Sequence, residues 1–168
     1  RGLGDVYKRQ IESGDIFTTD TWKALVNKCK DNGKMHFLGL LSDGNVHSHI
    51  NHLKALIKRA KEDGVKEVRL HVLLDGRDVP ETSALIYVED IENFMAELND
   101  DNFHACIASG GGRMKVTMDR YQADWPMVEL GWKTHVKGEG RQFASAMEAV
   151  ETYRKENDGI IDQDLPAF

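Results

Sequence analysis

Residues 68–78 read Val-Arg-Leu-His-Val-Leu-Leu-Asp-Gly-Arg-Asp, an apolar run that passes directly into an Asp-Gly turn. Apolar side chains recur at every second position of this run, which is typical of a β-strand that buries one face. These positions are Val68, Leu70, Val72 and Leu74. Glu67, Arg69 and His71 alternate with them, which indicates a second face less buried than that of a central parallel strand. The run therefore predicts a strand that ends in a polar loop.

The segments on either side repeat this arrangement. Strand-length apolar runs cover residues 35–41 and 103–108, and helical periodicity separates the three strands over residues 48–63 and 83–98. Consecutive parallel strands are joined by right-handed crossovers. We therefore expect an α/β fold of three layers, with a mainly parallel sheet and helices on both faces.

Three more helices are predicted outside this central part. One is capped by Thr19 or Asp20 and runs to about Lys30. Two follow the last strand, and their apolar stripes indicate core packing more often than cofactor contacts. The first stripe is Tyr121, Trp125, Val128 and Trp132, and the second is Phe143, Met147, Val150 and Tyr153.

The composition is that of one globular domain: 168 residues, 40% apolar and 30% charged. No apolar run approaches the ~20 residues of a membrane span. No signal peptide is visible, and Cys29 and Cys106 lie far apart, as in a reducing compartment, so we expect a cytoplasmic protein. The net charge of −6 argues against nucleic acid as a partner but permits a small anion held by converging arginines.

The two ends of the chain differ from the rest. Residues 1–10 (RGLGDVYKRQ) show no usable periodicity and no cap, and they resemble a translated adapter sequence. We therefore expect a non-native tail over residues 1–10 and a domain over residues 11–168. The chain stops at residues 164–168 on what reads as the edge of a new element, so we expect this domain to be incomplete at its C-terminal end.

A polar loop follows each of the three predicted strands. The loops are Ser-Asp-Gly-Asn-Val-His-Ser-His at residues 42–49, Asp-Gly-Arg-Asp at residues 75–78 and Ser-Gly-Gly-Gly-Arg at residues 109–113. The carboxyl ends of parallel strands share one edge of a sheet, and open α/β sheets bind their ligands there. The residues expected to meet at this edge are His47, Arg77, Asp78, Arg113 and, if the following segment folds back, Arg120.

The residue types at this edge point to an anionic hydroxy compound. Arginine guanidinium groups match carboxylate or phosphate oxygens two at a time. Asp78 can accept a hydrogen bond from a substrate hydroxyl or act as a general base, and His47 at a helix N-terminus can donate to an oxyanion. Gly44, Gly76 and residues 110–112 would let the backbone approach a ligand closely. The set predicts a small phosphorylated hydroxy acid as the ligand.

Simpler explanations exist for most of these features. Asp-Gly pairs are ordinary turn residues, and Arg77 with Asp78 could form a surface ion pair worth about 0–1 kcal/mol. His47, His49 and His52 lack the cysteine or carboxylate cluster of a metal site, so we expect no metal here. We expect His49 and His52 to cap or line the helix instead.

Three ordered motifs resemble the cofactor-independent phosphoglycerate mutases. They are LSDGNVHSH at residues 41–49, LDGRDVP at residues 74–80, and the pair GR and MDR within residues 112–120. The stretch 125–141 is similar as well, and the resemblance covers nearly all of residues 11–168. Asn45 stands where the family more often has glycine, a mild change because asparagine tolerates a left-handed backbone.

The resemblance implies an isomerase of glycolysis and gluconeogenesis that interconverts 3-phosphoglycerate and 2-phosphoglycerate through a phosphoserine intermediate. Such enzymes use two Mn²⁺ ions, or other divalent metals, in a domain of the alkaline phosphatase superfamily. A second domain, inserted into the first, binds the glycerate, and residues 11–168 resemble this inserted domain. The resemblance gives a catalytic role to Asp78 and substrate contacts to His47, Arg77, Asp78, Arg113 and Arg120.

The serine and metal-ligand motifs of the family lie outside these 168 residues. We therefore expect the fragment to bind no metal and to be inactive by itself. The intact enzyme is expected to be a monomer whose metal-bearing domain closes over the substrate. In that complete protein, Arg77→Ala or Arg113→Ala should abolish turnover and leave the fold intact.

Two other hypotheses compete with the mutase. The first is a stand-alone small-anion-binding module without catalysis. The second is a nucleotide-binding α/β domain, which fits the topology, but residues 110–112 do not form the GxGxxG pattern of a dinucleotide site.

Overall fold

The structure, a computed structural model, describes residues 3–117 and 124–168. Its described part centres on one three-stranded sheet in the order β1-β2-β3. The strands are β1 (Lys34–Leu41), β2 (Glu67–Leu74) and β3 (His104–Gly112). β2 pairs in parallel with both neighbours, so the predicted parallel sheet is confirmed.

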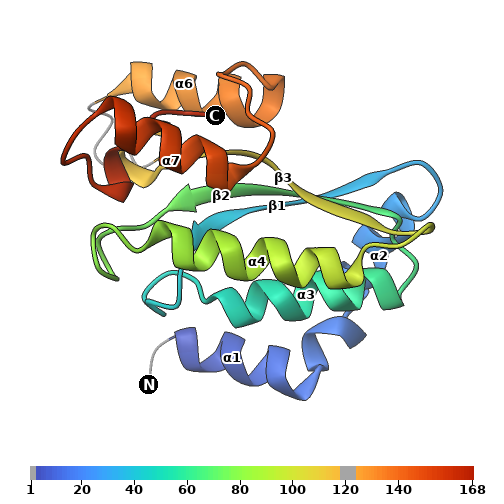
Figure 1. Ribbon diagram of the computed structural model, residues 1–168. Helices are drawn as coiled ribbons and strands as arrows, with labels where there is room; N and C mark the ends of the chain where they lie inside the picture. The colour runs from blue at the N-terminus through green and yellow to red at the C-terminus, as the bar shows by residue number, and fades with distance from the viewer. Residues whose placement is uncertain (1–2, 118–123) are drawn as a thin grey trace.

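Helices cover both faces of this sheet (Figure 1). α3 (Ile50–Glu62) and α4 (Ala84–Leu98) lie on one face, and α6 (Trp125–Lys137) and α7 (Ala146–Glu156) lie on the other. α2 (Asp20–Cys29) packs against β1. The three-layer α/β architecture predicted from the order of strands and helices is therefore confirmed.

The alternating residues of β2 form the centre of the core. Val68, Leu70, Val72 and Leu74 are each 2% exposed or less and share one apolar cluster with buried residues of α3 and α4. On the opposite face Glu67 and Arg69 are half-buried, as expected. His71 is 8% exposed, so the expectation of an open face is wrong at this position. Figure 1 shows the reason, because α6 lies over this face of the sheet.

The helices begin at side chains that satisfy their first backbone amides. Thr19 accepts from the amide of Trp22, as predicted, and starts α2. α3 begins at Ile50 rather than at residue 48, because His49 is its N-cap and accepts from the Asn51 amide. α7 begins at Ala146 after its cap Ser145, so the predicted start at Phe143 is wrong. Tyr121, which marked the predicted start of the preceding helix, lies outside the described residues.

β3 is longer than the sequence predicts. It continues through residues 109–112, which were expected to be a loop, and leads directly into α5 (Arg113–Val116). The added residues continue the parallel pairing with β2, and their other edge has a backbone partner distant in sequence. The amides of Gly110 and Gly112 donate to the carbonyls of Phe168 and Leu165, and the Phe168 amide donates back to Gly110. A short 3₁₀ helix, η2 (Asp162–Asp164), precedes this partner segment.

The N-terminal residues form a helix that the sequence analysis did not predict. α1 (Leu3–Ser13) is followed by the 3₁₀ helix η1 (Asp15–Thr18), and α1 lies beside α3, outside the sheet layers (Figure 1). Its Lys8, Arg9 and Gln10 have good helix propensity, and its contacts with η1 and α3 add the packing that so short a helix needs. An adapter origin of residues 1–10 stays a prediction.

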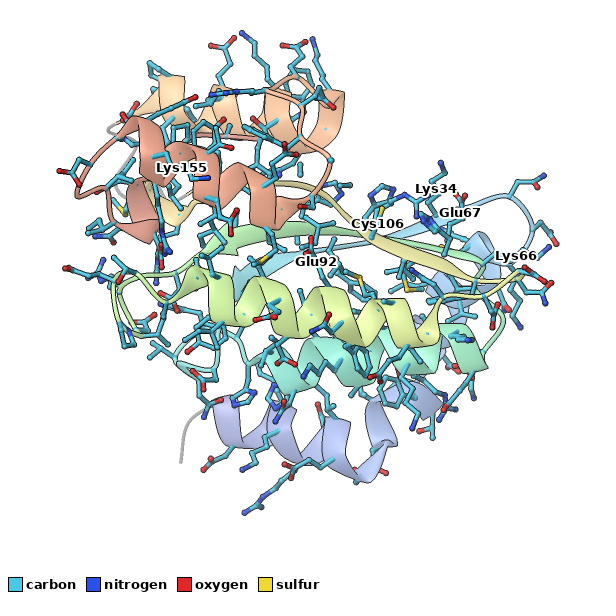
Figure 2. The ribbon with its side chains drawn as sticks, in the orientation of Figure 1. Lys34, Lys66, Glu67, Glu92, Cys106 and Lys155 are labelled. Carbon is cyan, nitrogen blue, oxygen red and sulfur yellow. The ribbon has the colours of Figure 1, made fainter. Side chains whose placement is uncertain are left out.

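The amino edge of the sheet is held by surface charges. Figure 2 shows Lys34 and Glu67 side by side at the starts of β1 and β2, with Nζ and Oε2 3.1 Å apart. Exposed pairs of this kind contribute about 0–1 kcal/mol. The polar loops lie at the opposite, carboxyl edge.

Within residues 3–117 and 124–168, no helix combines the length and the apolar character needed to cross a membrane.

Candidate functional site

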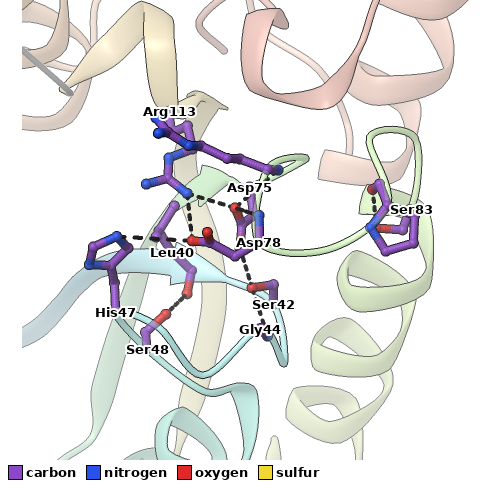
Figure 3. Close-up of polar contacts among 11 residues, drawn as sticks. Leu40, Ser42, Gly44, His47, Ser48, Asp75, Asp78, Ser83 and Arg113 are labelled. Atoms are coloured by element: carbon purple, nitrogen blue, oxygen red, sulfur yellow. Dashed lines mark hydrogen bonds and ion pairs between the residues drawn. The ribbon is translucent and has the colours of Figure 1, made fainter. Parts of the chain in front are cut away.

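The loops that follow β1 and β2 touch each other at the carboxyl edge of the sheet. A Cβ atom added to Gly44 would lie 2.9 Å from the Cβ of Asp78, closer than real side chains approach. Only a glycine therefore allows the loop at residues 42–49 to lie against residues 75–78. Arg113 joins them from the end of β3, and Figure 3 shows the resulting group of polar contacts.

Arg113 is the centre of this group, and it is 1% exposed. Its Nη1 atom donates to Oδ1 of Asp75 at 2.7 Å and to Oδ2 of Asp78 at 2.9 Å. Its Nε atom is buried without a partner in the described part of the chain. A buried guanidinium that is shared between two carboxylates is not an open fork for an anion. Arg113 therefore holds the loops in place.

Asp75 accepts hydrogen bonds from all three sheet-edge segments. Ser42 donates its hydroxyl to Oδ2 at 2.5 Å, and the amides of Arg77 and Asp78 donate to Oδ1 at 3.3 and 3.1 Å. Arg113 supplies the fourth bond. Burial alone would raise the pKa of Asp75, but the hydrogen bonds that its carboxylate accepts outweigh burial and hold that pKa below the ordinary value. The group is therefore ionised at neutral pH.

Asp78 is the carboxylate that a ligand can reach, because its side chain is 17% exposed. Its Oδ2 atom binds Arg113 and lies 4.0 Å from Nε2 of His47, whose side chain is 47% exposed. Oδ1 has no hydrogen-bond donor among the described residues, so it is open to accept from a hydroxyl group. His47 and Asp78 thus lie close together at the carboxyl edge, where the sequence predicted them.

Arg77 presents a free cation at the same edge. It is exposed, and within residues 3–117 and 124–168 its guanidinium makes no ion pair or hydrogen bond. A surface pair between Arg77 and Asp78 is therefore absent there, since Asp78 pairs with Arg113 instead. Arg120, the fifth predicted site residue, lies outside the described residues.

Three details of the loops test the sequence analysis further. Asn45 has a φ of 57°, so a left-handed residue is needed there and asparagine supplies it, as predicted. His49 caps α3, also as predicted. His47 precedes that cap by two residues, so its expected place at the helix N-terminus is wrong.

The glycine run 110–112 does not approach a ligand. A Cβ added to Gly110 would lie 2.4 Å from the ring of Phe168, and one added to Gly112 would lie 2.2 Å from the carbonyl oxygen of Gln163. These glycines instead make room for the C-terminal segment, and two of their amides bond to it. The same contacts remove the backbone amides that a nucleotide phosphate would need.

Sequence reasoning missed Ser42, which it gave no role, and Asp75, which it explained as a turn residue. Their partners lie 33 and 38 positions away, so no local pattern marks them. The available signal was the place of Asp75 itself, directly after a buried strand and before two amides that it can accept from. No cluster of three or more metal-ligating side chains occurs within residues 3–117 and 124–168.

Comparison with known proteins places this chain in a family. The model described as "BPG-independent PGAM N-terminus" matches residues 7–168. A probable 2,3-bisphosphoglycerate-independent phosphoglycerate mutase of Leptospira interrogans serogroup Icterohaemorrhagiae serovar Lai is 60% identical over 159 residues, which are 94% of this chain and 29% of that protein. The 2,3-bisphosphoglycerate-independent phosphoglycerate mutase of Trypanosoma brucei brucei is 46% identical over the same shares.

A solved structure agrees with the sequence matches. A crystal structure of Leishmania mexicana phosphoglycerate mutase, determined at low cobalt concentration, has a TM-score of 0.95 to this chain at 43% identity. The alignment covers 98% of this chain and 30% of that one. The chain thus spans under a third of the length of these relatives, at 29% and 30%.

Proposed function

The chain belongs to the BPG-independent phosphoglycerate mutase family and corresponds to its N-terminal part, and from this premise we propose that the full-length protein interconverts 3-phosphoglycerate and 2-phosphoglycerate. In this proposal the sheet-edge site binds the glycerate portion of the substrate. The observation that carries it is the meeting of His47, Asp78 and Arg113 at the carboxyl edge of the sheet. Arg77 lies on the same loop as Asp78 and is open to solvent.

Each of these side chains has a chemical task in the proposal. Arg77 offers a planar pair of N–H donors to a carboxylate or phosphate of the substrate. Oδ1 of Asp78 accepts the hydrogen of a substrate hydroxyl, and the same carboxylate can take that proton as a general base. Arg113 holds Asp78 through Oδ2, which leaves Oδ1 directed to the ligand. His47, close to Oδ2, can donate to a substrate oxyanion.

The family resemblance also implies two divalent metal ions, Mn²⁺ among them, and a serine nucleophile. The described residues do not fit a metal centre, since no cluster of three or more His, Cys, Asp or Glu side chains could hold an ion. We therefore assign these groups to the remainder of the full-length protein, and we infer that this chain alone catalyses nothing. It would act as an inserted domain that closes against the metal-bearing domain of the same chain, in a cytoplasmic monomer.

The test is an assay of the full-length protein for conversion of 3-phosphoglycerate without added 2,3-bisphosphoglycerate. Arg77→Ala should lower kcat/KM by about 10²-fold or more, as loss of one charged donor from a site does. Its thermal midpoint should not change, because the side chain is exposed. Arg141→Ala is the matched control, an exposed arginine paired with Glu156 away from the loops, and it should keep full activity.

The outcomes separate the hypotheses. A wild-type protein that binds phosphoglycerate in calorimetry but never turns it over would favour the anion-binding module. Equal activity in the Arg77→Ala and Arg141→Ala proteins would rule out the sheet-edge site as the substrate site. Stabilisation by nucleotides and not by phosphoglycerate would favour the nucleotide-binding domain.

A further inference from the structure

On the basis of the proposed function, we propose that Asp75 is the positioning residue of this site. It fixes the three sheet-edge segments in one geometry and leaves Asp78 available to the substrate. Asp75 does not face the ligand itself, because it is 3% exposed. Its effect passes through Arg113 and through the backbone of the neighbouring loops.

The carboxylate of Asp75 bonds to all three segments at the sheet edge. Oδ1 accepts from Nη1 of Arg113 at the end of β3 and from two amides of its own loop after β2. Oδ2 accepts from the Ser42 hydroxyl after β1, and the oxygen of Ser42 in turn accepts from the Gly44 amide at 3.3 Å. Figure 3 shows Ser42, Asp75 and Arg113 joined in one continuous network. All three strand ends are thus tied to one side chain.

Two carboxylates balance the charge of Arg113. Its guanidinium is almost completely buried and has two carboxylate partners within 2.9 Å. With Asp75 ionised, one negative charge already compensates Arg113. Asp78 then has to supply only part of the compensation, and its second oxygen remains available to a substrate hydroxyl. Without the charge of Asp75, Asp78 would be the only carboxylate paired with the buried Arg113.

A comparison with Asp162 distinguishes this role of Asp75 from ordinary structural support. Asp162 is a buried carboxylate of the same kind, 1% exposed, with one arginine partner and one backbone amide. It accepts from Nη2 of Arg154 at 2.6 Å and from the Ala84 amide at 2.7 Å. It has no hydrogen bond to His47, Arg77, Asp78 or Arg113. Asp162→Asn is therefore a control matched in burial and in bond types.

The experiment compares Asp75→Asn with Asp162→Asn in the full-length protein. Both variants should lower the thermal midpoint. Only Asp75→Asn should lower kcat/KM, by about 10²-fold, because a displacement of roughly 1 Å in a site has that effect. Crystal structures of the two variants should show Arg113 and residues 42–49 displaced in Asp75→Asn alone. An equal loss of activity in both variants, or unmoved loops in Asp75→Asn, would overturn the proposal.

Two further measurements keep the test decisive. If Asp75→Asn does not fold, Ser42→Ala removes one bond of the network and keeps the charge of Asp75, so it should still lower kcat/KM. Unchanged activity in Ser42→Ala would contradict the proposal. If the wild-type protein lacks mutase activity, the proposed function fails separately. Crystal structures then decide the positioning role: Arg113 and residues 42–49 should move in Asp75→Asn and not in Asp162→Asn. Positions that agree within about 0.5 Å in both variants would refute it.

Discussion

The Nη1 atom of Arg113 lies 2.7 Å from Oδ1 of Asp75, and each of the two side chains is 2% exposed. The contact joins the end of β2 to the start of α5, so it connects two of the three segments that make the site. Removing one partner of a buried ion pair leaves the other charge without compensation. The same contact therefore bears on both the stability of the domain and the geometry of its ligand-facing groups.

Arg113→Met should destabilise the protein strongly. Loss of one partner from a buried pair costs about 3–5 kcal/mol of unfolding free energy, because Asp75 stays buried and charged. From the sequence we expected both Arg77→Ala and Arg113→Ala to leave the fold intact. The structure changes this expectation for the buried Arg113 but not for the exposed Arg77. Denaturant unfolding of the full-length protein measures the difference.

Arg141→Met provides the comparison for that measurement. Arg141 binds Glu156 at 2.7 Å, but both side chains are nearly half exposed, at 47% and 45%. Exposed pairs contribute about 0–1 kcal/mol, so this variant should unfold close to the wild type. Similar unfolding free energies for the Arg113 and Arg141 variants would contradict the structural role of Arg113.

Gly44→Ala should damage the site through a steric clash. The new methyl group would lie 2.9 Å from the Cβ of Asp78 and 3.0 Å from its carbonyl oxygen, so one of the two loops must move. Overpacking of this kind costs about 1–3 kcal/mol. Gly39→Ala is the matched control, since a Cβ there meets nothing within 4 Å. We expect kcat/KM of the full-length enzyme to fall only in Gly44→Ala, and equal activity in the two variants would show that the loops need not touch.

The free energy of unfolding should decrease as the pH falls from about 6.5 to 4. The cause is the pair His71 and His135, which lie between the sheet and α6. Burial, together with the nearby His36 and His135, lowers the pKa of His71 to about 4. The unfolded chain, with an ordinary pKa near 6.5, then binds more protons than the folded chain in this range. The contribution of neutral His71 is complete above about pH 6.5 and is lost as the pH falls toward 4, on the order of 3 kcal/mol. Burial lowers the pKa of His135 as well, which acts in the same direction.

His71→Gln tests this pH dependence. Glutamine can still bond to Ser109, whose hydroxyl lies 2.6 Å from Nδ1 of His71, but it does not titrate. Unfolding free energies of the full-length protein at several pH values should show a smaller decrease toward pH 4 in the variant. Curves that stay parallel over the whole range would mean that His71 does not remain neutral in the folded protein.

The fold could be predicted because its signals are local. Alternating residues in β2 and helical stripes in α3 and α4 recur at fixed spacings, so burial of one face follows from the sequence alone. The starts of α3 and α7 were less well predicted. His49 caps α3, which begins two residues after the predicted start, and Ser145 caps α7 after the apolar stripe has already begun at Phe143. The extension of β3 was not predictable, because both of its backbone partners are distant in sequence: β2 on one side and a segment more than fifty residues further on at the other.

The candidate site, like the fold, could be predicted from the sequence only in part. The sequence by itself determined that His47, Arg77, Asp78 and Arg113 follow the strands of one parallel sheet, and parallel strands bring such residues to a single edge. Only the tertiary structure decided which of these charges remain free. Arg113 is neutralised by two carboxylates, Arg77 stays open to solvent, and the glycines 110–112 make room for residues 163–168. The physical reason is that a side chain's charge and exposure depend on partners far away in the chain, and no local periodicity encodes those partners.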